Sequence, residues 1–219
     1  MLSYRKLAMR VLGRPLNTGG GNNSPRPASQ RAAALILTAA LLTGAAFPAF
    51  AGTYYIEEGD ITISAGTVAG TNKVEQGGTL KSENDKDTVI TNQKTDKASS
   101  NTVTIEANGK NDKVEVTLKD VNIDTSSRNN AAVSVTGSGN TTIKLDGDNH
   151  LTGGISDTGN YGRNGIASTG SLTITGGENG SLTAQGGSGA DGGHGGHGIY
   201  SNGSLTISGG STVTANGGN

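Results

Sequence analysis

The chain has 219 residues, including 37 glycines and no cysteine, and its formal net charge is −1. That balance hides an asymmetry, because residues 1–51 contain six basic side chains and no acidic one, which leaves 11 basic and 18 acidic side chains in the rest. An acidic body argues against nucleic acid as a partner, since phosphate binding needs a basic surface. Without cysteine there are no disulfides, so stability has to come from packing and hydrogen bonding.

The N-terminal segment has the layout of a secretory signal peptide. A basic flank precedes an apolar run, which ends in the small-residue pattern Ala49-Phe50-Ala51. We predict that residues 1–51 are removed, that the mature protein starts at Gly52, and that it is secreted or displayed at the cell surface. A transmembrane anchor is the alternative, because the run approaches the length that a bilayer requires. Gly44 and Pro48 interrupt it, however, so we expect no integral membrane segment in the mature chain.

The first part of the mature chain, residues 52–98, is predicted to be an N-terminal cap or irregular first coil. Its apolar residues recur at short intervals without a clear repeat, at Ile56, Ile61, Ile63, Val68, Val89 and Ile90. The stretch from Lys81 to Ser100 is rich in Lys, Asp, Asn and Ser, and we expect it to be a solvated loop.

Residues 99–219 contain a repeat of four segments, each with three short runs of alternating apolar and polar residues. Successive opening runs lie 30, 33 and 33 residues apart and centre on Val103/Ile105, Val133/Val135, Ile166/Ser168 and Ile199/Ser201. The middle runs are Val116/Leu118, Ile143/Leu145, Leu172/Ile174 and Leu205/Ile207. The closing runs are Val121/Ile123, Leu151, Leu182/Ala184 and Val213/Ala215. Alternation with period two predicts strands with one buried face.

Three short strands per repeat cannot bury their inward faces alone, but a stack of coils can, because each strand then pairs with its counterpart one coil later. The sequence therefore predicts an all-β fold, a right-handed parallel β-helix (solenoid) with three short strands per coil. We expect about five coils in total, made up of the irregular first coil and the coils of residues 99–219. Leu172 is expected to lie over Leu205, and Ile174 over Ile207. A β-sandwich also has short alternating strands, but near-identical triplets favour the solenoid. No polar cap follows the last strand, so we expect the natural protein to continue with further coils.

Glycine pairs close many of the runs. The pairs are Gly176-Gly177, Gly186-Gly187, Gly209-Gly210 and Gly217-Gly218. We expect them to mark corners where the backbone bends sharply, a conformation that can require the positive φ that glycine allows.

An oxygen-rich turn provides the candidate metal site. The sequence DGDN places Asp146 and Asp148 two residues apart, with Asp120 about one coil earlier. Carboxylates at turns suit calcium, a hard cation, although turns commonly have this composition without binding a metal. The sequence therefore predicts calcium as the ion if one is bound.

Two glycine-rich patterns are weaker metal candidates. His194 and His197 have a spacing that some metal sites use. The stretch from Gly186 to His194 matches most of a calcium-binding nonapeptide that includes Asp191. A flexible corner loop explains both patterns without a metal.

The sequence does not present a catalytic constellation. A polysaccharide lyase on this fold would need a basic residue beside bound uronate, and the mature chain has only Arg128 and Arg163, both expected in loops. A glycosidase needs two facing carboxylates, and the last two coils contain only Glu178 and Asp191. We therefore predict a protein without enzymatic activity.

The phrases "KLDGDN", "GSLTITG" and "GSLTISGG" give the chain a resemblance to a known group over about residues 53–219. It resembles the secreted carbohydrate-binding β-helix domains of clostridia and related gut Firmicutes, whose fold is similar to that of pectate lyases. The resemblance implies a calcium-containing β-helix that binds acidic polysaccharide at the cell surface. The family's own metal ligands are not carried over to this chain. Asp146 and Asp148 are the first candidates to bind the ion, with Asp120 and Asp124 behind them.

These observations lead to two functional hypotheses. In the first, the chain is a carbohydrate-binding module whose partner is a polysaccharide or cell-surface glycan, and Tyr161 and Tyr200 stack on sugar rings. In the second, it is a structural stalk, an adhesin or an autotransporter-type passenger without a specific glycan site.

Overall fold

Short β-strands follow one another along the whole of the computed structural model, which describes residues 51–155, 161–190 and 193–219. These residues belong to the compact unit Phe47–Asn219. Apart from Ala51, the predicted signal peptide lies outside the described residues. The strands are β1 (Thr53–Tyr55), β2 (Ile61–Ala65), β3 (Asn72–Gln76), β4 (Thr79–Asp85), β5 (Thr88–Thr91), β6 (Val103–Ala107), β7 (Lys113–Lys119), β8 (Asn122–Asp124), β9 (Val133–Gly137), β10 (Asn140–Asp146), β11 (Asp148–Thr152), β12 (Ile166–Ser168), β13 (Ser171–Gly176), β14 (Ser181–Gln185), β15 (Ile199–Ser201), β16 (Leu205–Ile207) and β17 (Thr212–Asn216), with a short 3₁₀ helix η1 (Ile56–Glu58) after β1.

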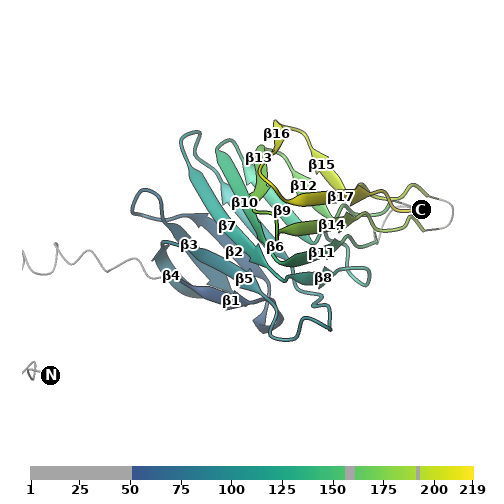
Figure 1. Ribbon diagram of the computed structural model, residues 1–219, viewed down its shortest axis with the longest axis horizontal. Helices are drawn as coiled ribbons and strands as arrows, with labels where there is room; N and C mark the ends of the chain where they lie inside the picture. The colour runs from purple at the N-terminus through teal and green to yellow at the C-terminus, as the bar shows by residue number, and fades with distance from the viewer. Residues whose placement is uncertain (1–50, 156–160, 191–192) are drawn as a thin grey trace, which may run out of the picture. The chain divides into compact units, whose positions relative to one another are not determined.

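The strands form three sheets that the chain visits in rotation. Sheet A has the order β1-β5-β7-β10-β13-β16, sheet C the order β8-β11-β14-β17, and sheet B the order β4-β3-β2-β6-β9-β12-β15. All pairs are parallel except those of β3 with β2 and β4. Each passage through A, C and B completes one turn, and Figure 1 shows successive turns side by side from the blue end to the yellow end. The predicted parallel β-helix is confirmed, with about four regular turns after an irregular first one.

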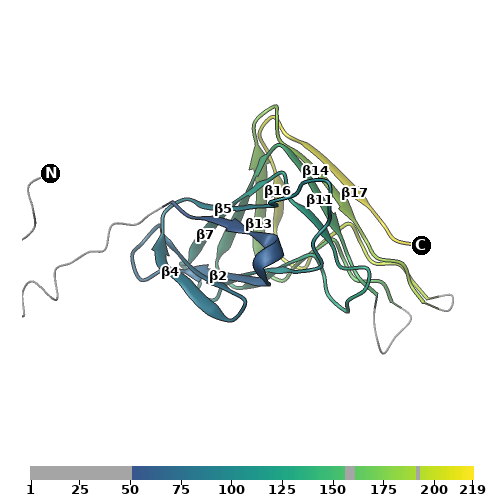
Figure 2. The same cartoon turned by 90° about the horizontal axis from the view of Figure 1, so that it is seen from below.

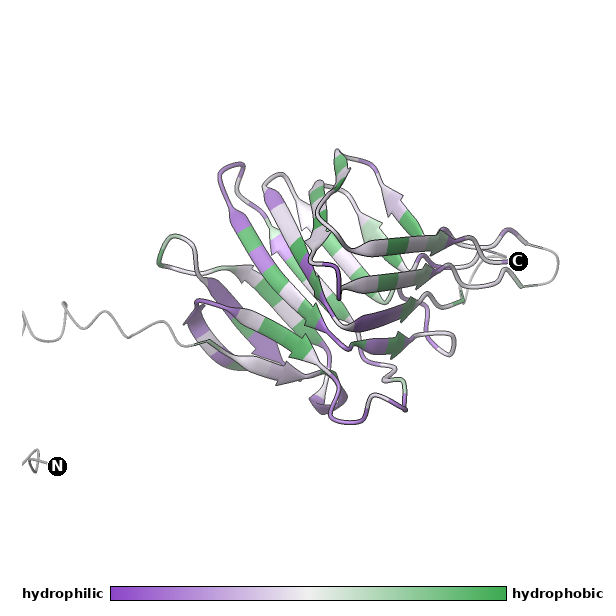
Figure 3. Cartoon of the chain, viewed as in Figure 1, coloured by the Kyte–Doolittle hydropathy of each residue, from purple (hydrophilic) through white to green (hydrophobic). Residues whose placement is uncertain are grey.

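Equivalent residues of successive turns lie next to each other in the sheets. In sheet B, Val133 pairs with Val103 and Ile166, and Ile166 pairs with Ile199. In sheet A, Leu172 pairs with Leu205 and Ile174 with Ile207, as predicted. The inward residues form a thin aliphatic core, visible in Figure 3 as green bands that alternate with paler or purple ones along the strands.

The register between β10 and β13 differs from the prediction. Ile143 pairs with Ile174 rather than with Leu172, and Thr141 takes the place beside Leu172. The two turns differ in the length of the connection from sheet B to sheet A. Val133 to Asn140 spans seven positions, whereas the equivalent stretch from Ile166 to Ser171 spans five, so the later turn is two residues shorter here. A shift of two keeps the same residues facing inward, so the core survives the change.

The stretch from Lys81 to Ser100, predicted to be a solvated loop, is only partly one. Residues 93–97 are exposed, but β4 and β5 occupy most of the stretch before them. Strand β5 pairs with β1 on one side and β7 on the other. Its polar composition hides the buried positions Asp85 and Thr88, which bond to each other and therefore satisfy their own polar groups.

The irregular first turn closes the start of the core. The helix η1 lies where later turns have a strand of sheet C, and its Ile56 is fully buried (Figure 2). Strands β3 and β4 extend sheet B as an antiparallel hairpin. Val68, expected among the apolar residues of this coil, is half exposed in the loop between β2 and β3.

We predict that Thr141→Val stabilises the protein. The Thr141 hydroxyl is buried without a hydrogen-bond partner, in a column of apolar side chains formed by Val114 and Leu172. Valine has nearly the same shape and no unsatisfied polar atom, so the melting temperature should rise by about 2–4 °C. The control is Thr142→Val, at the neighbouring outward position, which should change the melting temperature by less than about 1 °C. Equal effects of the two changes would contradict the conclusion that the Thr141 hydroxyl is buried without a hydrogen-bond partner.

Candidate functional site

Four exposed rings form a strip on one side of the last two complete turns. We call Tyr161, His194, His197 and Tyr200 the tyrosine–histidine strip. The rings of Tyr161 and His194 are stacked with their centroids 5.7 Å apart, and those of His197 and Tyr200 are stacked at 5.6 Å. Tyr161 is 60% exposed and Tyr200 43% exposed, so large apolar ring surfaces face the solvent.

The strip follows a period of three along the segment that leads into β15. His194, His197 and Tyr200 are exposed, whereas Gly196 and Gly198 between them are buried. With buried glycines between them, these three rings all lie on the exposed side of the segment. The turn before it is connected to this segment, because the His197 amide donates to the Asn164 side-chain oxygen at 2.8 Å.

The strip lies on glycine-rich segments that connect sheet C to sheet B. They extend each turn beyond sheets C and B, and Figure 2 shows the extensions of successive turns running alongside one another. Main-chain hydrogen bonds zigzag between outgoing and returning segments. The bonds are Gly154 N to Asn130 O (3.0 Å), Arg163 N to Gly154 O (2.7 Å), Gly187 N to Arg163 O (2.8 Å), Gly196 N to Gly187 O (2.8 Å) and Gly218 N to Gly196 O (2.8 Å). In the described parts of the extensions, backbone therefore packs directly on backbone in regular layers.

These layers require glycine because there is no room for a side chain. A Cβ at Gly187 would lie 2.0 Å from the Gly154 carbonyl oxygen, and one at Gly218 would lie 2.0 Å from the Gly187 oxygen. The eight residues of the predicted glycine pairs are all described, and only Gly209 has positive φ. The other seven do without positive φ, and at several of them close backbone approach is the reason for glycine.

The aspartates predicted to bind calcium lie at the corner between sheets A and C, but protein groups engage them. Asp146 forms an ion pair with Lys119 at 2.7 Å. Asp148 accepts a bond from the Ser181 hydroxyl, and its amide donates to an Asp120 carboxylate oxygen at 3.1 Å. Asp124 lies further along and accepts from the Ser126 amide at 2.8 Å.

This corner does not present a preformed metal cage. Within the described ranges, no group of three or more His, Asp, Glu or Cys side chains is arranged to hold a metal ion. The fourth residue of the turn, Asn149, is fully buried and joins three turns of the coil instead. Its oxygen accepts from the Val121 amide at 3.0 Å, and its nitrogen donates to the Ser181 carbonyl at 3.0 Å. The turn is thus chiefly a structural corner, and calcium here stays a prediction of the sequence.

The other sequence candidates are distributed over the loops. The histidines of the proposed metal pair stack on tyrosines, and Asp191 of the nonapeptide lies outside the described residues. Arg163 donates from Nε to the Asn129 side-chain oxygen at 2.6 Å. Glu178 is exposed in the turn after β13. The structure brings none of these together as a described acid–base pair.

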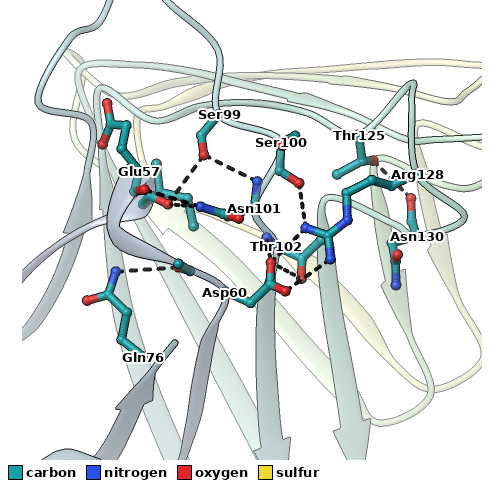
Figure 4. Close-up of polar contacts among 12 residues, drawn as sticks. Glu57, Asp60, Gln76, Ser99, Ser100, Asn101, Thr102, Thr125, Arg128 and Asn130 are labelled. Carbon is teal, nitrogen blue, oxygen red and sulfur yellow. Dashed lines mark hydrogen bonds and ion pairs between the residues drawn. The ribbon is translucent and has the colours of Figure 1, made fainter. Parts of the chain in front are cut away.

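A second polar cluster ties the first three turns together at the corner leading into sheet B. Arg128 makes two hydrogen bonds to the Asp60 carboxylate, at 2.9 and 3.0 Å, and one to the Ser100 carbonyl at 2.8 Å (Figure 4). The Thr102 amide donates to the same carboxylate at 2.7 Å. The hydrogen bonds from Arg128 are the main cause that lowers the pKa of Asp60.

A cavity of about 420 Å³ lies next to this cluster. Glu57, Lys94, Lys97 and Asn101 are among its lining residues. Burial alone would raise the pKa of Glu57, but hydrogen bonds from main-chain amides, led by that of Gln93 at 2.9 Å, outweigh burial and lower it. The Glu57 carboxylate therefore serves to hold the exposed loop over the first turn.

No family model matches this chain, and neither the curated proteins nor the solved structures include one with significant similarity to it. In residues 51–155, 161–190 and 193–219, no helix is long and apolar enough to cross a membrane.

The two tyrosines of the strip are among the ligand-binding residues predicted from the sequence, whereas its histidines are not. The sequence does contain a signal for them: Tyr161 and His194 are 33 residues apart, which is the repeat length of the last turns. His194, His197 and Tyr200 also follow one another at intervals of three residues.

We predict that Gly187→Ala is strongly destabilising and Gly177→Ala is not. The new methyl group at position 187 would meet backbone atoms of the Gly153-Gly154 segment, whereas a Cβ at Gly177 has nothing within 4 Å. Overpacking against backbone should lower the melting temperature by roughly 6–12 °C. Gly177→Ala should leave it unchanged or raise it slightly, since it reduces the freedom of the unfolded chain. Circular dichroism melts decide between these outcomes, and a harmless Gly187→Ala would refute the layered packing.

We predict an acid-sensitive contribution from the Asp60–Arg128 pair. Because the pKa of Asp60 is lowered in the folded state, its stabilisation is present above the unfolded value of about 4 and is lost as the pH falls through the folded value. The two side chains are 48% and 32% exposed. After allowance for solvent screening, Arg128→Met should cost about 1 kcal/mol at pH 7.

The comparison for this variant is Lys144→Met, which removes an exposed pair with Glu115 on sheet A. It should cost less than about 0.5 kcal/mol. Urea unfolding at pH 7 and pH 3 measures both variants. A deficit of Arg128→Met that persists unchanged at pH 3 would show that the ion pair is not its cause.

Proposed function

We propose that this protein is a secreted or cell-surface module that binds carbohydrate and has no catalytic activity. The observation that carries the proposal is the tyrosine–histidine strip, in which exposed rings are arranged along one side of the solenoid. The proposed export depends on the predicted signal peptide, residues 1–51. The proposal includes the resemblance to clostridial carbohydrate-binding β-helix domains, which is inferred from the sequence.

The strip carries the kinds of groups with which a protein recognises a sugar ring. The ring faces of Tyr161 and Tyr200 offer flat apolar surface, while the tyrosine hydroxyls and histidine nitrogens can donate or accept hydrogen bonds. The ordered glycine layers hold the intervening backbone, so binding requires little additional ordering of the protein. One stacked pair joins two turns and the other lies within the later turn, so several rings are exposed, which favours a chain of several sugars over a single one.

The choice of glycan follows from charge only in part. The mature chain is acidic, so a uronate polymer would need calcium as a bridge, and the aspartate corner with Asp146 and Asp148 is the predicted place for it. Because Lys119 and Ser181 engage these carboxylates, calcium would have to displace them. A neutral glycan needs no bridge, and a chelator distinguishes the two cases.

A structural stalk, adhesin or autotransporter-type passenger is the second candidate. It is supported by the stacking itself, in which like residues of successive turns pair, as Leu172 does with Leu205 and Ile174 with Ile207. A stalk would need no exposed rings on its side.

We predict that Tyr161→Ala and Tyr200→Ala each weaken binding to the recognised polysaccharide by about three- to tenfold, because each removes one stacking surface. Affinity electrophoresis in gels containing polygalacturonate, xylan or glucomannan measures the retention, with and without a chelator. Tyr55→Ala is the matched control, since Tyr55 is also exposed but belongs to β1 at the other end of the solenoid.

Retention that depends on both tyrosines of the strip but not on Tyr55 supports the carbohydrate-binding module. Loss of retention with chelator supports calcium-mediated uronate binding. Absence of retention on every polysaccharide tested would remove the carbohydrate proposal and favour the stalk.

A further inference from the structure

A buried carboxylate near the start of the described chain has neutral hydrogen-bond donors as its partners. Asp85, at the end of β4, is fully buried. One of its oxygens accepts from the Gly52 main-chain nitrogen at 2.8 Å and the other from the Thr88 hydroxyl at 3.0 Å. The Tyr54 hydroxyl also bonds to it, and burial together with Asp85 raises the pKa of Tyr54.

This carboxylate has no cationic partner in the described part of the chain, where the ion pairs involve Asp60, Glu75, Glu115 and Asp146. The neighbouring Lys86 and Asp87 are exposed. A buried carboxylate is costly unless a positive charge compensates it. The three neutral donors reduce that cost, but a cation at one of their positions would reduce it further.

The Gly52 nitrogen is the position where a cation can arise. It is held in place, because the Gly52 carbonyl accepts from the Val89 amide at 2.9 Å as part of the pairing between β1 and β5. The site also requires glycine: a Cβ at position 52 would lie 2.4 Å from the Tyr54 hydroxyl and 2.6 Å from Asp85. Ala51, on the other side of the peptide bond, is exposed and therefore accessible.

We propose that cleavage between Ala51 and Gly52 creates an α-ammonium group that forms an ion pair with Asp85, so that removal of the leader completes the N-terminal cap. The proposal depends on the predicted cleavage site Ala49-Phe50-Ala51 and is independent of carbohydrate binding. In the cleavage a peptidase adds water across the peptide bond. The hydroxyl goes to the Ala51 carbonyl carbon, leaving a carboxylate, and the Gly52 nitrogen takes up protons to become an ammonium group.

The ion pair makes stability depend on pH in a way that the uncleaved chain cannot reproduce. An α-amino group has an ordinary pKa near 7.7–8.0, and a buried carboxylate beside it raises that value in the folded state. The added stability is present below the ordinary value and is lost as the pH rises through the raised one. Asp85 and Tyr54 are the other ionisable groups that face this nitrogen. Both are present before and after cleavage, so a comparison at equal pH cancels their contribution.

The experiment has two steps. The full chain is exported from a bacterial host, and the mass of the product locates the new N-terminus. Since Phe47–Asn219 is a compact unit by itself, melting temperatures are then compared for the chain 52–219 with a free amine, the same chain acetylated at Gly52, and the chain 51–219. Acetylation removes only the charge.

At pH 6.5 the free Gly52 chain should melt at least about 4 °C above the other two. This difference should shrink above pH 10 and should be absent when all three chains carry Asp85→Asn. If Asp85→Asn does not fold, the acetylated chain still isolates the charge. Equal melting temperatures of the free and acetylated chains, or an N-terminus at another residue, would overturn the proposal.

Discussion

Stacking of equivalent side chains at one-turn intervals is the constraint on which this structure depends. Each strand is too short to be stable alone, and the core is only as wide as the inward side chains of three strands. Pairing Val133 with Val103 and Ile166 satisfies main-chain hydrogen bonds and buries apolar surface in one step. The distance from sheet B to sheet A shortens by three residues before β10 and by two before β13, yet inward positions stay paired. The connections between the sheets therefore absorb the differences in turn length, and the stacked strands keep their inward face.

The same constraint explains why function would lie at the edge of the coil. Inward positions are occupied by the core, and the outer faces of sheets A and C carry mainly threonine, serine and charged residues. The extensions between sheets C and B lie outside the core, and in their described parts glycine allows backbone to pack on backbone. Exposed side chains on such packed segments are held in place by the layers beneath them. The tyrosine–histidine strip follows from this geometry.

At the start of the coil, the end of the aliphatic core has to be covered by elements other than a regular turn. The chain uses a short helix, an antiparallel hairpin and two polar clusters around Asp60 and Asp85 for this purpose. Asp60 has an arginine as partner, and Asp85 has the nitrogen of Gly52. If the leader is removed at that residue, Asp60 and Asp85 each have a cation as partner, and folding of the cap is linked to export.

The sequence by itself determined the class of fold, the strand positions after residue 99 and the pairing of Leu172 with Leu205, because period two and the 33-residue repeat are local properties that stacking preserves. It also identified Tyr161 and Tyr200. Only the tertiary structure decided that Thr141 stands beside Leu172, that β4 and β5 occupy a stretch of polar composition, and that Asp146 is paired with Lys119. It likewise revealed that glycine pairs serve close backbone contacts and that histidines join the tyrosines. Most of these features depend on contacts between residues about one turn apart, which follow from turn lengths and exact register. Of the features named here, the 33-residue spacing of Tyr161 and His194 is the one that a repeat search can find in the sequence.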